Sequence, residues 1–242
     1  MSNSALISYT KLSPNKTSPR NHKIDTITIH HMAAVNATIE ACGAGFALSS
    51  RQASANYGIG SDGRIALYVD EADRSWASSS GANDHRAVTI EVANSGGDPN
   101  WPVSDKAYAA LIELCADICR RNGIARLVWA SSKSDRVNHK NGANMTVHQD
   151  FAATACPGPY LLGRMADIAA QVNARLAGEE EDEMKIYHWF ADMPDWARPS
   201  AEKAYQRGIL KADAKSGAVN VYECNLQPLV WMDRLGLLDG GG

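Results

Sequence analysis

The chain has 242 residues, of which 45% are hydrophobic and 21% charged, and its formal net charge is −3. This balance is typical of a globular protein, and the absence of an overall basic charge argues against a nucleic-acid partner. No apolar run reaches the roughly 18 residues that a membrane span needs, so we expect no membrane partner. The length suits one domain of ordinary size and a small second one.

The first 17 residues are polar and carry no apolar core of signal-peptide length, so we expect synthesis in the cytoplasm without a signal peptide. The five cysteines are odd in number and irregular in spacing, which favours free thiols over a disulfide framework. Cys115 and Cys119 are expected in the core on one helix, and Cys42 and Cys224 are expected to be buried thiols.

The first half of the chain is rich in strand signals. β-Branched residues alternate in residues 25–31 and predict a strand, and residues 37–49 are compatible with a helix. Residues 56–60 and 64–69 flank a Ser-Asp-Gly turn and predict a hairpin. Residues 87–93 predict a further, central strand.

Helical patterns dominate the next part of the chain. Residues 104–122 form an amphipathic pattern, with Ser104 as N-cap and Gly123 just past the end. Residues 126–130 predict a short strand, and residues 159–177 a second helix. Because strands and helices alternate, we predict an α/β domain with a mixed central sheet flanked by helices.

An acidic run at residues 178–183 interrupts this pattern. Adjacent like charges repel one another and do not pack, so we predict a solvated linker between a domain of residues 1–177 and a second domain of residues 184–242. A short helical end is the alternative interpretation.

The composition shifts after this run. Trp189, Trp196 and Trp231 are half of the six tryptophans, and Gly208 marks the end of one predicted helix, while residues 225–235 form another. A unit of this size is near the lower limit for independent folding. We therefore expect a small, mainly helical domain whose core contains the tryptophans.

Two weak signals point to a metal. His148 and Cys156 lie eight residues apart, and His30 ends a strand, where a side chain is held firmly. A catalytic zinc site needs three protein ligands and one open position, and imidazole nitrogen and thiolate both suit zinc. Because side chains alternate along a strand, only one of His30 and His31 should bind the metal directly.

The strongest evidence is an ordered set of four segments, at residues 27–31, 54–65, 88–94 and 148–158. Together they resemble the type 2 N-acetylmuramoyl-L-alanine amidase family, which includes phage endolysins, bacterial autolysins and peptidoglycan recognition proteins. The resemblance covers roughly residues 20–176. It implies Zn2+-dependent hydrolysis of the amide between N-acetylmuramic acid and L-alanine in bacterial peptidoglycan.

The resemblance also implies a ligand set and a division of roles. His30, His148 and Cys156 match the three zinc ligands of the family. Two neutral imidazoles and one thiolate would leave the centre with a net charge of about +1, and water bound at such a centre has a pKa near 7.

Three further positions match polar residues of the family's active sites. Glu91 matches the catalytic glutamate, which would take a proton from the attacking water and pass it to the leaving amine. Tyr57 matches a tyrosine beside the metal, and Thr154 a polar position, so either would donate a hydrogen bond to the developing oxyanion. Ala77 follows Trp76 where many members have histidine, and His85 is a candidate to compensate.

The resemblance leaves several biological roles open. We expect a phage or prophage endolysin that reaches the cell wall after release, with a non-catalytic peptidoglycan-binding protein, an autolysin or a wall-recycling amidase as alternatives. The segment 184–242 resembles small helical modules behind wall hydrolases. It is expected to bind a cell-wall polymer and raise the local enzyme concentration there, or to form a homodimer.

Overall fold

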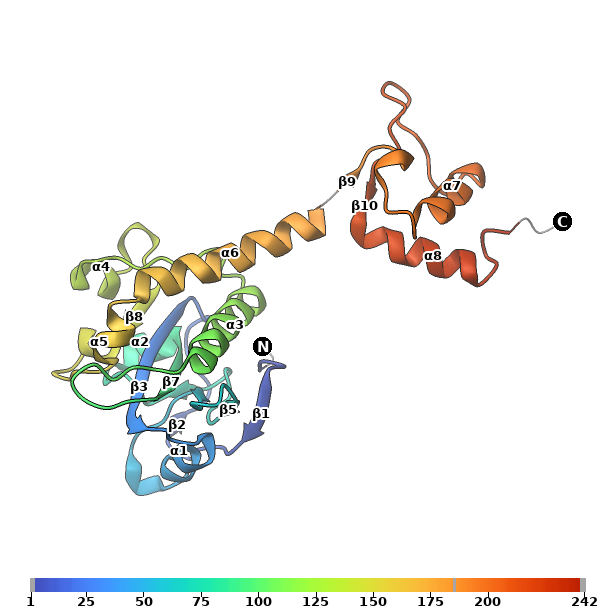
Figure 1. Ribbon diagram of the computed structural model, residues 1–242. Helices are drawn as coiled ribbons and strands as arrows, with labels where there is room; N and C mark the ends of the chain where they lie inside the picture. The colour runs from blue at the N-terminus through green and yellow to red at the C-terminus, as the bar shows by residue number, and fades with distance from the viewer. Residues whose placement is uncertain (1–2, 185, 240–242) are drawn as a thin grey trace. The chain divides into compact units, whose positions relative to one another are not determined.

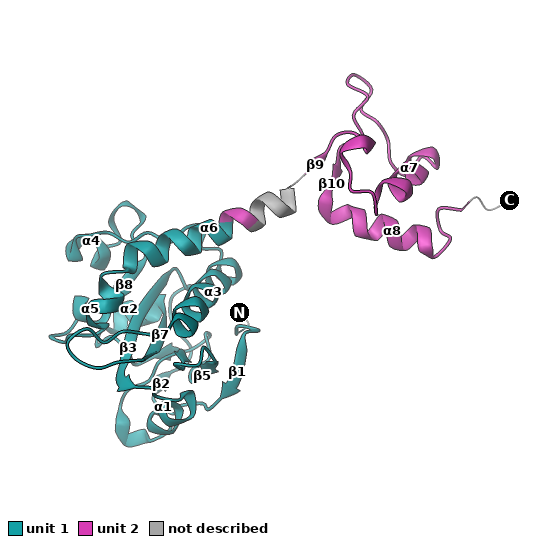
Figure 2. Ribbon diagram, in the orientation of Figure 1, with its two compact units in different colours: residues 1–176 teal, residues 177–242 magenta. Residues whose placement is uncertain are grey.

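A computed structural model describes residues 3–184 and 186–239, and for residues 179–184 it describes the course of the backbone alone. The chain divides into two compact units, residues 1–176 and 177–242 (Figure 2). Unit 1 holds the predicted α/β domain, and unit 2 holds the tryptophan-rich segment.

A six-stranded mixed sheet with the order β1-β5-β4-β7-β3-β8 forms the centre of unit 1 (Figure 1). Its central strands β4, β7, β3 and β8 are parallel, whereas β4 and β5 form the predicted antiparallel hairpin. The strands are β1 (Ile7–Thr10), β3 (Thr26–Val35), β4 (Tyr57–Ile59), β5 (Ile65–Leu67), β7 (Ala87–Asn94) and β8 (Met145–Val147). The predicted mixed sheet, with residues 87–93 in its interior, is confirmed.

The register of β3 and β7 sets what each face of the sheet carries. Ile29 lies opposite Ile90, and the next pair along is His30 and Glu91. Because side chains alternate across a strand, the isoleucines face one side and His30 and Glu91 the other. The apolar face packs in the main core with helices α3 (Asp105–Asn122) and α6 (Met165–Met184).

Helix α3 follows its predicted bounds closely. The Ser104 hydroxyl accepts a hydrogen bond from the Ala107 N–H, and Gly123 adopts φ 69° at the C-terminal end. These are the usual ways to satisfy the free backbone groups of a helix end. The eight buried residues of α3 include Cys115 and Cys119, which lie in the core as predicted.

The single helix predicted at residues 159–177 is two helices, α5 (Gly158–Leu162) and α6. A tight turn separates them, in which the Arg164 N–H donates to the Leu161 carbonyl three residues earlier. Helix α6 then continues through the acidic run 178–183, which is the helical alternative rather than the linker. Alanine and glutamate are strong helix formers, and this propensity outweighs charge repulsion along the run. The predicted solvation of these acidic side chains lies outside the described residues.

Short elements complete unit 1. Helix α1 (Ile39–Phe46) is shorter than the predicted span 37–49, because Thr38 caps its start and the 3-10 helix η1 (Ser49–Arg51) follows. The remaining elements are β2 (Lys16–Thr17), β6 (Arg74–Ser75), α2 (Gly81–Arg86), α4 (Lys133–Val137), η2 (Lys140–Gly142) and η3 (His148–Asp150).

The strand predicted at residues 126–130 is wrong. The Leu127 N–H donates to Asn173 Oδ1 at 2.8 Å, and Asn173 Nδ2 donates to the Leu127 carbonyl at 2.9 Å. The Val128 N–H donates to Asn144 Oδ1 at 2.8 Å. Side-chain amides thus take the place of a neighbouring strand and satisfy this buried backbone.

Unit 2 is small and mainly helical, as predicted. Its elements are the antiparallel pair β9 (Ile186–Tyr187) and β10 (Val221–Tyr222), the helices α7 (Arg198–Gln206) and α8 (Leu226–Arg234), and the 3-10 helices η4 (Phe190–Asp192) and η5 (Glu223–Asn225). Gly208 and Gly236 follow the two helices with positive φ.

The core of unit 2 differs from the prediction. Trp189, Trp196 and Trp231 are exposed by 49%, 54% and 57%. Small and aliphatic side chains fill the core instead, among them Ala197, Ala201, Ala204, Val221, Leu226 and Val230. The alanines let α7 and α8 pack closely, which leaves no space for an indole between them.

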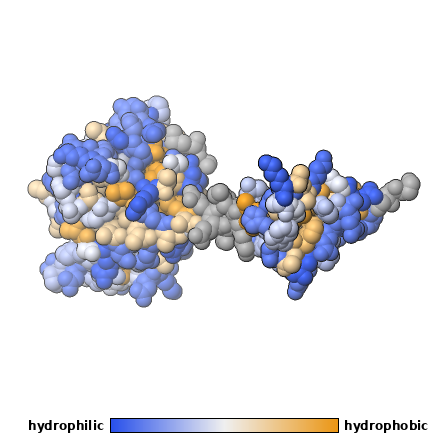
Figure 3. All heavy atoms as spheres, turned by 90° about the horizontal axis from the view of Figure 1, so that it is seen from above, coloured by the Kyte–Doolittle hydropathy of each residue, from blue (hydrophilic) through white to orange (hydrophobic). Residues whose placement is uncertain are grey.

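In the described residues, no helix is both long and apolar enough to cross a membrane. On the face shown in Figure 3, hydrophilic residues cover much of both units, and apolar residues gather in smaller patches. Cys224 is exposed, contrary to prediction, and Cys42 is half-buried.

Candidate metal centre and pocket

His30, His148 and Cys156 form one cluster on one face of the sheet. His30 lies in the middle of β3, which continues to Val35, and does not end the strand as the sequence predicts. His30 lies on β3, His148 directly follows β8, and Cys156 precedes α5. One potential ligand atom from each lies within 4.8 Å of the other two. His30 Nδ1 is 3.5 Å from Cys156 Sγ, and the two imidazole centroids are 5.0 Å apart. The structure therefore brings together the three residues that the sequence predicts as metal ligands.

Burial sets the protonation states of the three residues in this cluster. Burial, with smaller effects of His148 and His31, lowers the pKa of His30 to about 3, and burial also lowers the pKa of His148. Both imidazoles are therefore neutral near pH 7 and have lone pairs to donate. Burial and the nearby Glu91 raise the pKa of the Cys156 thiol.

His30 Nε2 is buried without a hydrogen-bond partner among the described residues. Burying a polar atom without a partner costs free energy. A metal ion bound by the imidazole ring would give His30 a partner that the protein itself does not supply. The donor set of two imidazoles and one thiol fits zinc, and with three ligands it leaves a fourth position open.

His31 faces the other side of β3, as strand alternation predicts. Its ring packs edge-on against Trp101, with centroids 5.4 Å apart. Gly158, at φ 81°, lies close to both residues: a Cβ there would lie 3.1 Å from Trp101 Cβ and 3.2 Å from the His31 ring. Glycine thus allows the turn that carries Cys156 to close onto β3.

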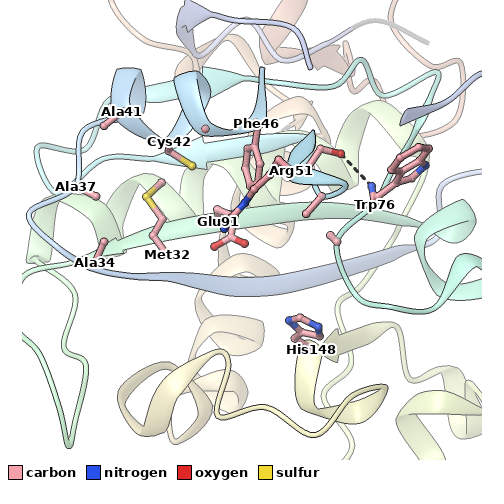
Figure 4. A pocket seen from close by; sticks show the side chains of 14 residues that line it. Met32, Ala34, Ala37, Ala41, Cys42, Phe46, Arg51, Trp76, Glu91 and His148 are labelled. Atoms are coloured by element: carbon pink, nitrogen blue, oxygen red, sulfur yellow. Dashed lines mark hydrogen bonds between the residues drawn. The ribbon is translucent and has the colours of Figure 1, made fainter. Parts of the chain in front are cut away.

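Glu91 lies beside His30 on β7 and lines a cavity of about 450 Å³ that also includes His148 (Figure 4). Its Oε2 is buried and has no hydrogen-bond partner in the described part of the chain. Burial raises its pKa to about 8, and the charge of Arg51 opposes this shift. A carboxyl group with a pKa near neutrality can both take up and release a proton at working pH.

Tyr57 does not join this cluster. It lies opposite Ile90 on the apolar side of the sheet. Its hydroxyl donates to Glu71 Oε1 at 2.6 Å and accepts from the Ser4 N–H at 3.0 Å, and Glu71 is paired with Arg121 at 2.7 Å. The predicted place beside the metal is therefore wrong, because a buried polar network on the opposite face holds this hydroxyl.

Thr154 lies in the turn that carries Cys156. Its Oγ1 accepts a hydrogen bond from the Cys156 N–H at 3.2 Å, and its side chain is exposed. The structure thus places it next to a predicted ligand, on the side of a shallow depression that Lys133 and Gln149 also line.

His85 does not replace the histidine that Ala77 lacks. Its Nδ1 accepts a hydrogen bond from the Asn21 N–H at 3.0 Å, and it is not one of the residues lining the cavity. Ala77 itself lines the cavity together with Trp76. The rim of the cavity at this point is therefore formed without a histidine at either position.

Sequence reasoning missed the group that holds this rim. Asp84 is buried and accepts hydrogen bonds from the Ala77 N–H at 3.1 Å, the Ser78 N–H at 3.1 Å and the Ser78 hydroxyl at 2.5 Å. The loop presents Ser79, at φ 65°, with its hydroxyl 3.4 Å from His148 Nε2. A non-glycine residue at positive φ is unusual and often marks a functional site.

Asn83 connects the same loop to the ligand-bearing strands. Its Nδ2 donates to Thr28 Oγ1 at 2.9 Å and to Ser78 Oγ at 3.2 Å, and its Oδ1 accepts from Thr146 Oγ1 at 3.0 Å. Thr28 lies two residues before His30 on β3 and pairs with Thr146 on β8, so both threonines lie on the same face of the sheet as His30.

Comparison with known families shows which family the chain belongs to. A family model described as N-acetylmuramoyl-L-alanine amidase matches residues 20–159. The chain belongs to this family. The matched span of the amidase contains His30, Glu91, His148 and Cys156. No curated protein matches the amidase sequence significantly.

Solved structures confirm the fold of the amidase. PlyL is 16% identical with a TM-score of 0.51, and the match covers 69% of this chain and 96% of that chain. The PlyG catalytic domain is 16% identical with a TM-score of 0.51, covering 69% and 94%. A mutant endolysin from Bacillus subtilis is 18% identical with a TM-score of 0.50, covering 69% and 99%. At these identities the likeness establishes the fold of unit 1.

Proposed function

We propose that this amidase uses zinc to hydrolyse the amide between N-acetylmuramic acid and L-alanine in peptidoglycan. The observation that carries the proposal is the convergence of His30, His148 and Cys156 within 4.8 Å, beside a carboxyl group on the same face of the sheet. The family membership supplies the bond that is cut.

The chain's own residues divide the work. Zinc held by the three ligands would supply Lewis acidity toward the scissile carbonyl and toward water. Glu91 takes a proton on its carboxylate and returns it to the leaving amine, a role that suits its raised pKa. Thr154 steadies the Cys156 turn by accepting the Cys156 N–H, and its hydroxyl proton remains available to an oxyanion.

Cleavage of isolated Gram-positive cell walls tests this proposal. Zinc-loaded protein should release L-alanine amino termini, lose this activity with a chelator, and regain it with zinc. Glu91→Gln should lower the rate by about 10²–10⁴-fold with zinc still bound, since this is the usual contribution of a general acid-base group. Release of reducing sugars without new amino termini would contradict the amidase assignment.

We further propose that unit 2 binds the cell wall and that the amidase acts as an endolysin, as a phage or prophage product. The exposed indoles of Trp189, Trp196 and Trp231 support wall binding, because exposed aromatic rings are typical of recognition surfaces. A homodimer through unit 2 is the alternative use of these rings. The complete ligand set argues against a non-catalytic binding protein, and a wall-binding unit against recycling of soluble fragments.

A further inference from the structure

The cavity beside the metal centre has two different ends. His148 and Trp76 lie toward one end, and Glu91 lies between the ends (Figure 4). The other end is formed by α1 and the end of β3 and is lined mostly by small or apolar side chains: Met32, Ala34, Ala37, Ala41, Cys42 and Phe46. Sugar hydroxyls would find few partners at such a wall, so this end suits a small apolar side chain such as that of alanine.

Arg51, on η1, brings a permanent positive charge to the middle of the cavity, between its two ends. Figure 4 shows its side chain extending into the cavity on the side of Glu91. The charge of Arg51 acts on two other residues that line the cavity, Glu91 and Cys42. Burial raises the pKa of both groups, and Arg51 offsets part of that rise.

The guanidinium of Arg51 differs from those of most arginines of unit 1, which bind an acidic or backbone partner. Within the described residues it makes no hydrogen bond or ion pair, and its side chain is exposed. By contrast, Arg64 binds Glu40 at 2.6 Å, and Arg136 binds Asp150 at 2.6 Å. A guanidinium left unpaired in a cavity is free to bind a carboxylate of a ligand, which it contacts through two parallel hydrogen bonds.

We propose that Arg51 binds a free carboxylate of the peptide stem and so makes the amidase selective for stems whose residue after L-alanine carries that carboxylate. The inference rests on the proposed function, since it assumes that the scissile amide lies at the metal cluster beside Glu91. The L-alanine methyl group then meets the alanine-lined wall, and the next residue of the stem reaches Arg51. An amidated stem offers Arg51 a neutral group and loses this contact.

Two soluble substrates that differ in one group test the inference. N-acetylmuramoyl-L-alanyl-D-glutamate carries the free α-carboxylate, and N-acetylmuramoyl-L-alanyl-D-isoglutamine carries the amide. The zinc-loaded full chain should cleave the acid with a kcat/KM about tenfold higher, mainly through KM, because hydrogen bonds to charged groups are among the stronger ones. Arg51→Gln should abolish the preference, and Arg51→Lys should restore part of it.

Arg126→Gln is the matched control. Arg126 is also exposed, and it lines a different depression, away from the residues of the metal cluster. It should leave the preference for the acid intact. Thermal unfolding of Arg51→Gln should match that of the wild type, because an exposed guanidinium without a protein partner adds little to stability.

A second measurement does not require the enzyme to cleave these small substrates. The product peptides L-alanyl-D-glutamate and L-alanyl-D-isoglutamine compete with cell walls for the enzyme, and the acid should inhibit wall cleavage more strongly in the wild type but not in Arg51→Gln. Equal cleavage and equal inhibition by acid and amide in the wild type would overturn the role of Arg51 while leaving the amidase function intact. Failure to release amino termini from walls would instead overturn the proposed function.

Discussion

At the scale of single residues, Cys156 gives the most direct test of the metal centre. Its raised thiol pKa keeps it protonated near neutral pH without metal, whereas His30 and His148 are already neutral. Because zinc binds the thiolate, zinc binding should release about one proton. Calorimetric titration in buffers of different ionisation enthalpy measures this number, and a value of about zero would contradict thiolate ligation.

Substitution of the same residue gives a second readout. Cys156→Ser should weaken zinc binding by at least about 100-fold, since loss of even an outer partner of a ligand costs about 10–100-fold. Cys42→Ser is the control: Cys42 lines the cavity but is not part of the ligand cluster. Equal zinc affinity in the two variants would exclude Cys156 as a ligand.

Glu91 makes the stability of the metal-free protein depend on pH. Its pKa rises from 4.5 to about 8 on folding, so its contribution to stability is fully present below about pH 4.5 and is lost as pH rises through about 8. Wild type should lose on the order of 2 kcal/mol of free energy of unfolding across this range relative to Glu91→Gln, after allowance for partial exposure. Denaturant unfolding of both proteins, with a chelator present, measures this loss across the same pH range. Equal pH dependence of the free energy of unfolding in wild type and Glu91→Gln would contradict a raised pKa.

The sequence was informative about residues whose direction follows from local geometry. Alternation along β3 separates His30 from His31. Glu91 was predicted from the family resemblance, and its place next to His30 depends on the register of β7 with β3. Tyr57 could not be placed in this way, because the direction of its ring depends on the register of β4, and its hydroxyl is taken by Glu71, which lies 14 residues further along the chain.

At the scale of elements, the loop before α2 connects packing to the site. Asp84 holds it through three hydrogen bonds from Ala77 and Ser78, which in turn positions Ser79 at His148. Asp84→Asn would point an N–H2 group at these donors. We expect kcat/KM on cell walls to fall about 10–100-fold with zinc still bound, since small displacements at an active site are costly.

The control for this substitution is Asp167→Asn, an exposed carboxylate on α6 that accepts the Tyr108 hydroxyl. It should leave both zinc content and activity unchanged. If Asp84→Asn lost zinc in proportion to activity, Asp84 would act on the ligands themselves and not on the loop.

Elements with a strong period were predictable, and elements formed by tertiary partners were not. The apolar stripe and both caps of α3 lie in consecutive residues, so its bounds follow from the sequence. Strand β8 has three residues and becomes a strand only by pairing with β3. Residues 126–130 have strand-like composition, but the amides of Asn144 and Asn173 bind their backbone first.

At the scale of the whole molecule, the change in composition after the acidic run indicates a second unit, but composition does not predict which side chains form the core of unit 2. Tryptophan content predicts an indole core, whereas Ala197, Ala201 and Ala204 lie on α7 at helical spacing and pack in the core. Composition counts side chains without saying which way they face, so it cannot separate an aromatic core from an aromatic surface.

That surface gives the last prediction. Replacing Trp189, Trp196 and Trp231 together by alanine should reduce binding to sedimented cell walls by about tenfold or more, because exposed indoles are frequent binding hot spots. Cleavage of soluble muramyl peptides should be unchanged, because these rings lie outside unit 1. Leu235→Ala is the control, since Leu235 is a side chain of the same unit that is 74% exposed but not aromatic. If wall binding persisted and sedimentation showed instead that the triple variant turned a dimer into a monomer, the tryptophans would serve self-association and not wall recognition.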